Sequence, residues 1–143
     1  MRASPSRRAL VDTSAHYALA DPQDAYHAAA SAIIERLTNT PSRLFTTNLI
    51  VAETHALFLV RRGRQVALRA LEAIDRSNVT IVRVGVADER RARAILAQYD
   101  DKDFTLTDAT SFAVMERLNI GYAFTFDRHF AQYGLPVLSP DQL

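Results

Sequence analysis

Short apolar runs alternate along the chain with longer segments in which apolar residues recur at helical spacing. Short, continuously apolar runs are typical of strands in a buried parallel sheet, and the helical spacing is typical of amphipathic helices. The predicted strands are residues 9–11, 44–47, 79–84, 122–126 and 135–138. The predicted helices are residues 14–20, 23–37, 49–62, 65–75, 87–99 and 108–118. Strands separated by helices need crossover connections, so we expect an α/β fold: a three-layer α/β/α sandwich with a mainly parallel central sheet.

Polar residues mark the predicted ends of these elements. Asn48 and Thr107 are suited to N-cap the helices that follow them, and Gly63 is suited to the position just after a helix. Two acids, Asp12 and Asp127, directly follow apolar strands. Sheets of this kind bind ligands outside the carboxyl ends of their strands, so both acids are candidates for a functional site.

Composition narrows the class of protein. The length of 143 residues suits one domain, so we expect residues 1–143 to form a single domain. No apolar stretch approaches the length needed to cross a bilayer. The chain has no cysteine, which excludes disulfides and thiolate metal sites and fits a cytoplasmic location. The net charge is +1, and Lys102 is the only lysine among 17 basic residues, so any basic patch consists of arginines.

Three candidate acids each have an ordinary structural interpretation. Asp12 and Asp127 can cap the short helices that follow them, and Asp108 lies in a first helical turn, where the helix dipole favours an acid. Thr13 and Ser14 are equally able to cap the helix after Asp12, which leaves that carboxylate free for another role.

The fourth candidate, Glu53, lies within a helix. It shares a face with apolar Ile50 and Leu57, where a carboxylate loses hydration and needs a partner. At the edge of that face it could instead reach water or Arg64. If the four acids lie together at one edge of one sheet, separate structural roles no longer explain them, because like charges repel unless a cation neutralises them. A hard divalent ion, Mg²⁺ or Mn²⁺, suits such an oxygen-rich site and would support hydrolysis of a phosphodiester.

Four short motifs together resemble the PIN-domain family, and more narrowly the VapC-type toxins of bacterial toxin–antitoxin pairs. They are ALVDTSA at 9–15, NLIVAET at 48–54, LTDA at 106–109 and TFDRHF at 125–130. The resemblance covers the chain from residue 9 to residue 138. It implies that a catalytic metal ion is held by four acids, namely Asp12, Glu53, Asp108 and Asp127. It also implies a hydroxyl residue beside the metal, for which Thr13, Ser14 and Thr125 are the candidates.

The resemblance further implies a metal-dependent endoribonuclease that cleaves tRNA or ribosomal RNA, forms a homodimer and is blocked by a small antitoxin. A PIN nuclease of RNA processing and a catalytically silent PIN-like RNA-binding module are the alternatives. Asp101 and Asp103 could assist the site or belong to a solvated loop. Haloacid-dehalogenase-type phosphatases are disfavoured because they need a second acid where Ser14 stands. Phospho-receiver domains are disfavoured because they need a lysine at the end of a later strand, whereas the only lysine, Lys102, lies in the acidic loop.

Several residues outside the acids are candidates for contacts with RNA or protein. Arg61, Arg62 and Arg64 surround the predicted turn at Gly63 and are candidates for RNA phosphate contacts, with a solvated helix end as the alternative. Phe58 and Leu59 are candidates for a dimer or antitoxin surface, although core packing explains them equally well. The remaining candidates are Tyr17 and Tyr26, which could stack on bases or pack internally, and His129, which is expected to be a surface histidine.

Overall fold

Four parallel strands form the centre of the structure, in the order β3-β2-β1-β4. The structure is a computed structural model, and it describes residues 7–139. The strands are β1 (Arg7–Val11), β2 (Ser42–Thr47), β3 (Thr80–Val82) and β4 (Tyr122–Phe124). The helices are α1 (Thr13–Ala20), α2 (His27–Thr38), α3 (Asn48–Arg62), α4 (Arg64–Arg76), α5 (Val86–Gln98), α6 (Leu106–Leu118) and α7 (His129–Tyr133).

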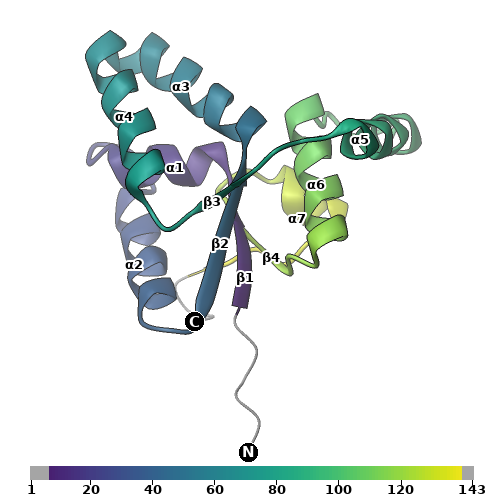
Figure 1. Cartoon of the computed structure of the whole chain (residues 1–143), viewed down its shortest axis with the longest axis horizontal. Coiled ribbons are helices and arrows are strands. Elements are labelled where there is room, and N and C mark those ends of the chain that lie inside the picture. The colour runs from purple at the N-terminus through teal and green to yellow at the C-terminus, as the bar shows by residue number, and fades with distance from the viewer. Residues whose placement is uncertain (1–6, 140–143) are drawn as a thin grey trace, which may run out of the picture.

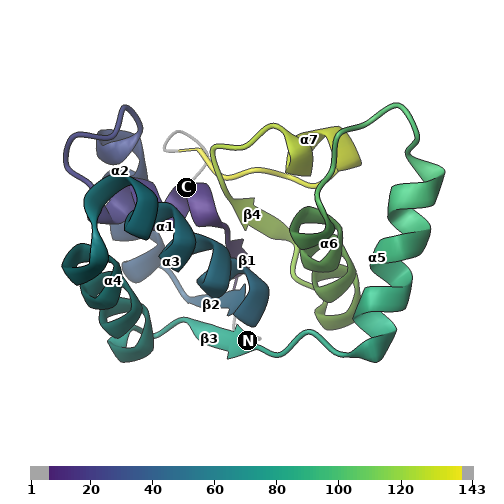
Figure 2. The ribbon, with the colours of Figure 1, turned by 90° about the horizontal axis from the view of Figure 1, so that it is seen from above.

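The helices form two groups on opposite sides of the sheet. Helices α1 to α4 gather on one side and α5 to α7 on the other, with the strands between them (Figures 1 and 2). This arrangement confirms the predicted α/β/α sandwich, and all the pairings between named strands are parallel. Within residues 7–139, no helix is both long enough and apolar enough to cross a membrane.

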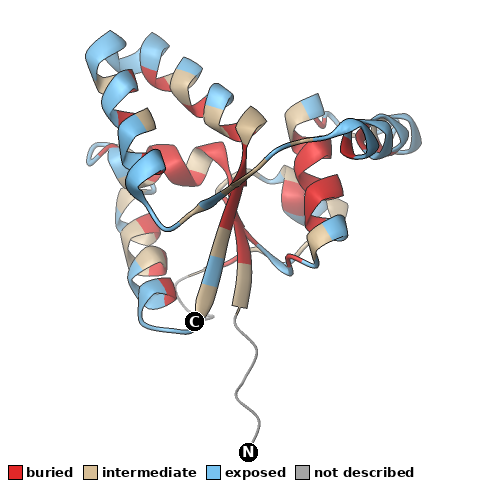
Figure 3. Cartoon of the chain, viewed as in Figure 1, coloured by how far each residue is buried: buried red, intermediate tan, exposed pale blue. Residues whose placement is uncertain are grey.

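Strand β1 contributes side chains to a hydrophobic core on each face of the sheet. Successive side chains of a strand point to opposite faces of its sheet, so the two faces of β1 carry different residues. Leu10 belongs to the core beneath α5, α6 and α7, where Ile95, Phe112 and Phe130 are fully buried. Ala9 and Val11 belong to the core beneath α1 and α2. Figure 3 shows the buried residues concentrated along the strands and along α1 and α6. Both layers of helices therefore fix the position at which β1 ends.

The two predicted helix caps are wrong by one or two residues. Helix α3 is capped by Thr47, whose hydroxyl accepts a hydrogen bond of 3.1 Å from the backbone N–H of Ile50. Asn48 instead accepts a hydrogen bond of 2.9 Å from the backbone N–H of Val84, in the segment that leads from β3 to α5. Helix α6 is capped by Thr105 rather than Thr107, because Thr105 and Asp108 exchange two hydrogen bonds of 3.0 Å in a capping box.

Other predicted boundaries are too wide. The strand predicted at 79–84 covers only Thr80–Val82, and the one predicted at 122–126 ends at Phe124. The segment 135–138 forms a single bridge, between Ala123 and Val137, instead of a strand. The helix predicted from residue 23 begins at His27, since the preceding residues form turns stabilised by hydrogen bonds to Asp21 and Asp24.

The buried face of α3 also differs from the prediction. Its buried residues are Ile50, Thr54 and Phe58, so the face runs at intervals of four and leaves Glu53 exposed beside it. Phe58 packs against Tyr17 with ring centroids 4.6 Å apart and is buried, so the core-packing interpretation of this residue is the one that the structure supports. The exposed apolar side chains on this helix are Leu59 and Val60, which are 46% and 85% exposed.

The cap of α3 has a measurable contribution to stability. We expect Thr47→Ala to lower the free energy of unfolding by about 1 kcal/mol or somewhat more, because the N–H of Ile50 loses its acceptor in a buried position. Thr47→Ser retains the hydroxyl and should recover most of the loss. Urea unfolding followed by circular dichroism measures both, and an equal loss in the two variants would contradict the capping role.

Candidate active site

The carboxyl ends of β1 and β4 lie side by side and carry the first two acids. The backbone N–H of Asp12 donates a hydrogen bond of 3.0 Å to the carbonyl of Phe124, the last residue of β4. Just beyond β4, the hydroxyl of Thr125 donates a hydrogen bond of 2.9 Å to Asp12 Oδ2. The same hydroxyl accepts a hydrogen bond of 3.0 Å from the backbone N–H of Asp127. Thr125 therefore fixes the Asp12 carboxylate relative to the backbone that carries Asp127.

The start of α1 connects these strand ends to α3. Asp12 occupies the N-cap position of α1, but its side chain makes no capping hydrogen bond. The hydroxyl of Thr13 donates a hydrogen bond of 2.7 Å to Glu53 Oε1. The hydroxyl of Ser14 donates a long hydrogen bond of 3.4 Å to Asp12 Oδ2 and accepts one of 2.9 Å from the backbone N–H of Phe126. Neither hydroxyl caps α1, so that part of the sequence interpretation is wrong, but both contact the acids.

Asp108 and Asp127 meet at the side chain of His129. The Nδ1 atom of His129 lies 2.8 Å from Asp108 Oδ2 and 3.2 Å from Asp127 Oδ1. The backbone N–H of His129 also donates a hydrogen bond of 2.9 Å to Asp127 Oδ1. His129 was expected to be a surface histidine, and this prediction is wrong, because its side chain is only 16% exposed. Its position two residues after Asp127, in a turn that an Asp side chain stabilises, was the signal that could have identified it.

Hydroxyl, amide and imidazole groups thus contact all four predicted acids. Asp12 and Asp108 are buried, Asp127 is partly exposed and Glu53 is exposed. Burial raises the pKa of Asp12 from its ordinary value of 3.8 to about 7; the hydrogen bond from Thr125 opposes the increase, and the charges of Asp108 and Glu53 add to it. A buried carboxylate among other carboxylates lacks a compensating charge. Because the donor atoms of the four acids are all oxygens, the set fits a hard divalent cation.

A cleft of about 270 Å³ opens beside three of the acids, Asp12, Glu53 and Asp127. Tyr26 stacks on Phe126 at its rim, with ring centroids 4.7 Å apart and an interplanar angle of 11°, while remaining 52% exposed. The guanidinium of Arg61 lies 5.0 Å above the ring of Tyr17. The remaining lining residues are Thr13, Ser14, Asp24 and Leu57.

The three arginines predicted to contact RNA lie in different environments. Arg61 lines the cleft. Arg62 instead forms an ion pair of 2.8 Å with Asp21, and Arg64 is exposed at the start of α4. In the acidic loop, Asp101 pairs with Lys102 at 3.0 Å, while Asp103 is exposed. Arg61 is therefore the arginine of the three that the structure brings to the acids.

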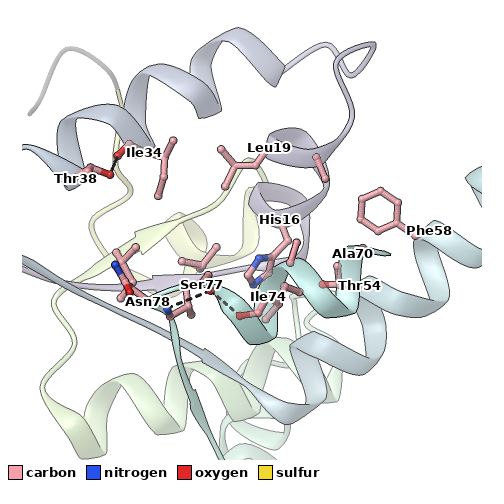
Figure 4. Close-up of a pocket in the computed structure, with 15 residues that line it drawn as sticks. His16, Leu19, Ile34, Thr38, Thr54, Phe58, Ala70, Ile74, Ser77 and Asn78 are labelled. Carbon is pink, nitrogen blue, oxygen red and sulfur yellow. Dashed lines mark hydrogen bonds between the residues drawn. The ribbon is translucent and has the colours of Figure 1, made fainter. Parts of the chain in front are cut away.

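A second cavity of about 390 Å³ has a different character. It lies between α1, α2, α3 and α4, and its lining is mostly apolar (Figure 4). The labelled side chains of Leu19, Ile34 and Phe58 come from three of these helices. His16 also lines it; its Nε2 lies 3.1 Å from the hydroxyl of Thr46, which donates to the carbonyl of Val11. Burial lowers the pKa of His16 to about 4, so the ring is neutral near pH 7. This cavity offers an apolar contact surface and not a second set of acids.

The sequence as a whole matches a known family. A family model for the PIN domain matches residues 9–135. The chain belongs to the PIN-domain family. It resembles the VapC-type members most clearly: it is 35% identical over 133 residues to the 23S rRNA-specific endonuclease VapC20 of Mycobacterium tuberculosis, covering 92% of this chain and 98% of that protein. It is also 28% identical over 123 residues to ribonuclease VapC26 of the same organism, covering 85% and 89% of the two chains.

Solved structures of PIN-domain proteins agree with this assignment. The crystal structure of M. tuberculosis VapC20, described as a toxin that cleaves the sarcin–ricin loop, matches with a TM-score of 0.85 and 30% identity over 92% of this chain and 99% of that one. A toxin–antitoxin complex from Klebsiella pneumoniae matches with a TM-score of 0.61 and 19% identity, over 92% of this chain and 97% of that chain. The second likeness shows the shared fold.

The raised pKa of Asp12 predicts how stability depends on pH. The folded state keeps the Asp12 proton up to about pH 7, whereas the unfolded state loses it near pH 3.8. The folded state therefore binds more protons within this window, and stability falls as pH rises through it, by roughly 4 kcal/mol at most. Asp12→Asn keeps the shape of the side chain without the charge, so it should flatten this dependence and stabilise the metal-free protein at pH 8.

Urea unfolding at pH 5 and pH 8, in the presence of a chelator, measures the difference between the two proteins. The wild type and Asp12→Asn should differ little at pH 5 and most at pH 8. Parallel pH profiles would show that Asp12 ionises as freely in the folded state as in the unfolded state.

Proposed function

We propose that this protein is a Mg²⁺- or Mn²⁺-dependent endoribonuclease and the toxin of a toxin–antitoxin pair. The observation that carries the proposal is the convergence of Asp12, Glu53, Asp108 and Asp127 at the carboxyl edge of the sheet, where hydroxyl hydrogen bonds hold Asp12 and Glu53 and the ring of His129 lies between Asp108 and Asp127. The names of the relatives support the reaction class, because VapC20 and VapC26 are named as an endonuclease and a ribonuclease.

The residues of the site have distinct proposed roles. Asp12, Glu53, Asp108 and Asp127 hold the metal ion, with Asp12 at the centre of the set. A bound divalent ion lowers the pKa of water and stabilises negative charge on the phosphate. Thr125 keeps Asp12 in place, and Thr13 keeps Glu53 turned toward the strand ends. These hydroxyls orient the acids before an ion binds, which reduces the ordering that binding requires.

The cleft beside the acids supports an RNA substrate. Arg61 supplies a cation for a phosphate, and the exposed face of Tyr26 offers a platform for an unpaired base. A single arginine and an exposed ring beside the acids suit an unpaired nucleotide, so we propose cleavage within a single-stranded loop. Since VapC20 is named as specific for 23S rRNA, a ribosomal RNA loop is the first substrate to test.

Isosteric changes to the acids test the reaction. Asp12→Asn, Glu53→Gln and Asp108→Asn should each reduce Mn²⁺-dependent cleavage of ribosomal RNA by at least about 100-fold, because each removes a charged ligand. Asp127→Asn should have a smaller effect, since its side chain is less buried than those of Asp12 and Asp108 and is not oriented by a hydroxyl as Glu53 is by Thr13. Sequencing of RNA ends gives both the rate and the position of cleavage.

The same variants, expressed without an antitoxin, should no longer arrest growth. Asp75→Asn is the matched control, because Asp75 is an exposed acid on α4 away from the site. Growth arrest that persists in all three folded variants would contradict the mechanism. Cleavage without growth arrest in the wild type would instead favour an RNA-processing nuclease. Saturable RNA binding without cleavage would favour a catalytically silent binding module.

The apolar cavity between α1, α2, α3 and α4 supports an antitoxin partner. We propose that an amphipathic segment of the antitoxin places apolar side chains there, since the cavity is open and mostly apolar. The match to a toxin–antitoxin complex from K. pneumoniae is consistent with such a partner. The exposed pair Leu59 and Val60 on α3 is a candidate for the homodimer interface.

A charge placed in the cavity separates antitoxin binding from catalysis. Ala73 is an exposed residue of α4 that lines the cavity, so Ala73→Arg adds a bulky cation without emptying the core. We expect this change to weaken binding of the small protein encoded by the adjacent gene by at least about tenfold, with RNA cleavage unchanged. Ala97→Arg is the matched control, because Ala97 is an exposed residue of α5. Calorimetry measures the affinity, and unchanged affinity in Ala73→Arg would place the antitoxin elsewhere.

A further inference from the structure

The imidazole of His129 is mostly buried and lies between two carboxylates, unlike the ring of a solvated surface histidine. We propose that His129 Nδ1 is itself a metal ligand, which together with Asp108 and Asp127 forms a mixed nitrogen–oxygen set and biases the centre toward Mn²⁺ over Mg²⁺. This inference rests on the proposed function, since it assigns one more ligand to the same metal centre.

The spacing of the three ligand atoms is the first observation. His129 Nδ1 lies 2.8 Å from Asp108 Oδ2 and 3.2 Å from Asp127 Oδ1, and one potential ligand atom from each of the three residues lies within 4.8 Å of the others. Adjacent ligands of an octahedral ion with bonds of about 2.1 Å lie about 3.0 Å apart. The two distances lie on either side of that value.

The direction of the imidazole nitrogen is the second observation. Nδ1 is buried from solvent, yet it forms no hydrogen bond with either carboxylate despite the short distances. A hydrogen bond needs the carboxylate oxygen to lie along the N–H direction, and neither oxygen does. Metal coordination has a different requirement: the ion, and not a carboxylate oxygen, lies along the direction of the nitrogen lone pair, and the two oxygens approach the ion from the sides. A buried and unpaired nitrogen between two carboxylates meets that requirement.

The backbone and the neighbouring rings hold the imidazole in this position. The backbone N–H of His129 is bonded to Asp127 Oδ1 at 2.9 Å, which couples the ring to one of its partner acids. The edge of the ring packs against Phe104, with centroids 5.7 Å apart and an interplanar angle of 81°. The next residue, Phe130, is fully buried in the core and anchors α7. The ring is therefore oriented before any ion arrives.

A nitrogen ligand changes which ion the site prefers. Carboxylate oxygens suit Mg²⁺ and Mn²⁺ alike, whereas imidazole suits first-row transition ions better than it suits Mg²⁺. An all-carboxylate set would discriminate weakly between the two ions. Adding His129 strengthens the binding of Mn²⁺ while changing that of Mg²⁺ much less. The competing explanation is that His129 is a counter-charge for the acids without being a ligand, and it predicts no such difference.

The decisive experiment observes the nitrogen directly. Electron spin echo modulation of Mn²⁺ bound to the full chain should show coupling to an imidazole ¹⁴N. His129→Phe keeps a ring to pack against Phe104 but has no nitrogen, so the ¹⁴N coupling should disappear and Mn²⁺ affinity should fall by at least about tenfold. The affinity for Mg²⁺, measured by competition, should change less than about threefold.

Two further variants keep the test sharp. His129→Asn offers an amide oxygen in place of Nδ1, so it should keep Mg²⁺ binding and lose the ¹⁴N imidazole signal, and it serves if the Phe variant fails to fold. His55→Phe is the matched control: His55 lies two residues after Glu53 on α3 and therefore faces another direction, so the signal should remain.

The outcomes separate this inference from the proposed function. Saturable Mn²⁺ binding without ¹⁴N coupling in the wild type, or coupling that survives His129→Phe, would overturn the role of His129 and leave the carboxylate centre in place. Equal losses of Mn²⁺ and Mg²⁺ affinity in His129→Phe would also overturn it. A wild-type protein without saturable Mn²⁺ binding would overturn both.

Discussion

The burial of Asp12 next to other carboxylates is the constraint on which the site depends. Burial raises the pKa of Asp12 to about 7, because a carboxylate removed from water is less stable when charged, and the charges of Asp108 and Glu53 add to the increase. The surrounding hydroxyls hold the side chain without neutralising it, since Thr125 donates to Asp12 and Thr13 donates to Glu53. The charged form of Asp12 lowers the stability of the fold and favours the binding of a cation, and perturbed groups of this kind are common at functional sites.

The two helical layers make this arrangement rigid. Leu10 packs into one core while Ala9 and Val11 pack into the other, so the end of β1 cannot shift without disturbing both. The hydrogen bond between the Asp12 amide and the Phe124 carbonyl extends the pairing of β1 and β4 to the position where the acids begin. On α3, the Thr47 cap fixes the start of the helix, and Thr13 then contacts Glu53 farther along it.

The alternation of apolar and polar residues was sufficient to predict the layers, most of the elements and the convergence of the acids. It failed where the outcome depended on contacts between distant segments. Asn48 looks like a cap in the sequence but accepts a hydrogen bond from the backbone N–H of Val84, and the sequence left open whether Phe58 faces a partner or the core, where it packs on Tyr17. The contact of His129 with Asp108 was not predicted, because the two residues come from different helices and only the tertiary structure brings them together. Local spacing carries no information on such pairs.

The order of the strands has a consequence during synthesis of the protein. Strand β4 pairs with β1 from the far end of the chain, and Thr125, Asp127 and His129 all follow β4 in sequence. A growing chain that has emerged only as far as α5 can form local helices but lacks half of the acids and the partner strand that orders Asp12. Contacts between such distant segments form late in folding. A ribosome is therefore not exposed to a working nuclease until it has synthesised the chain through α7.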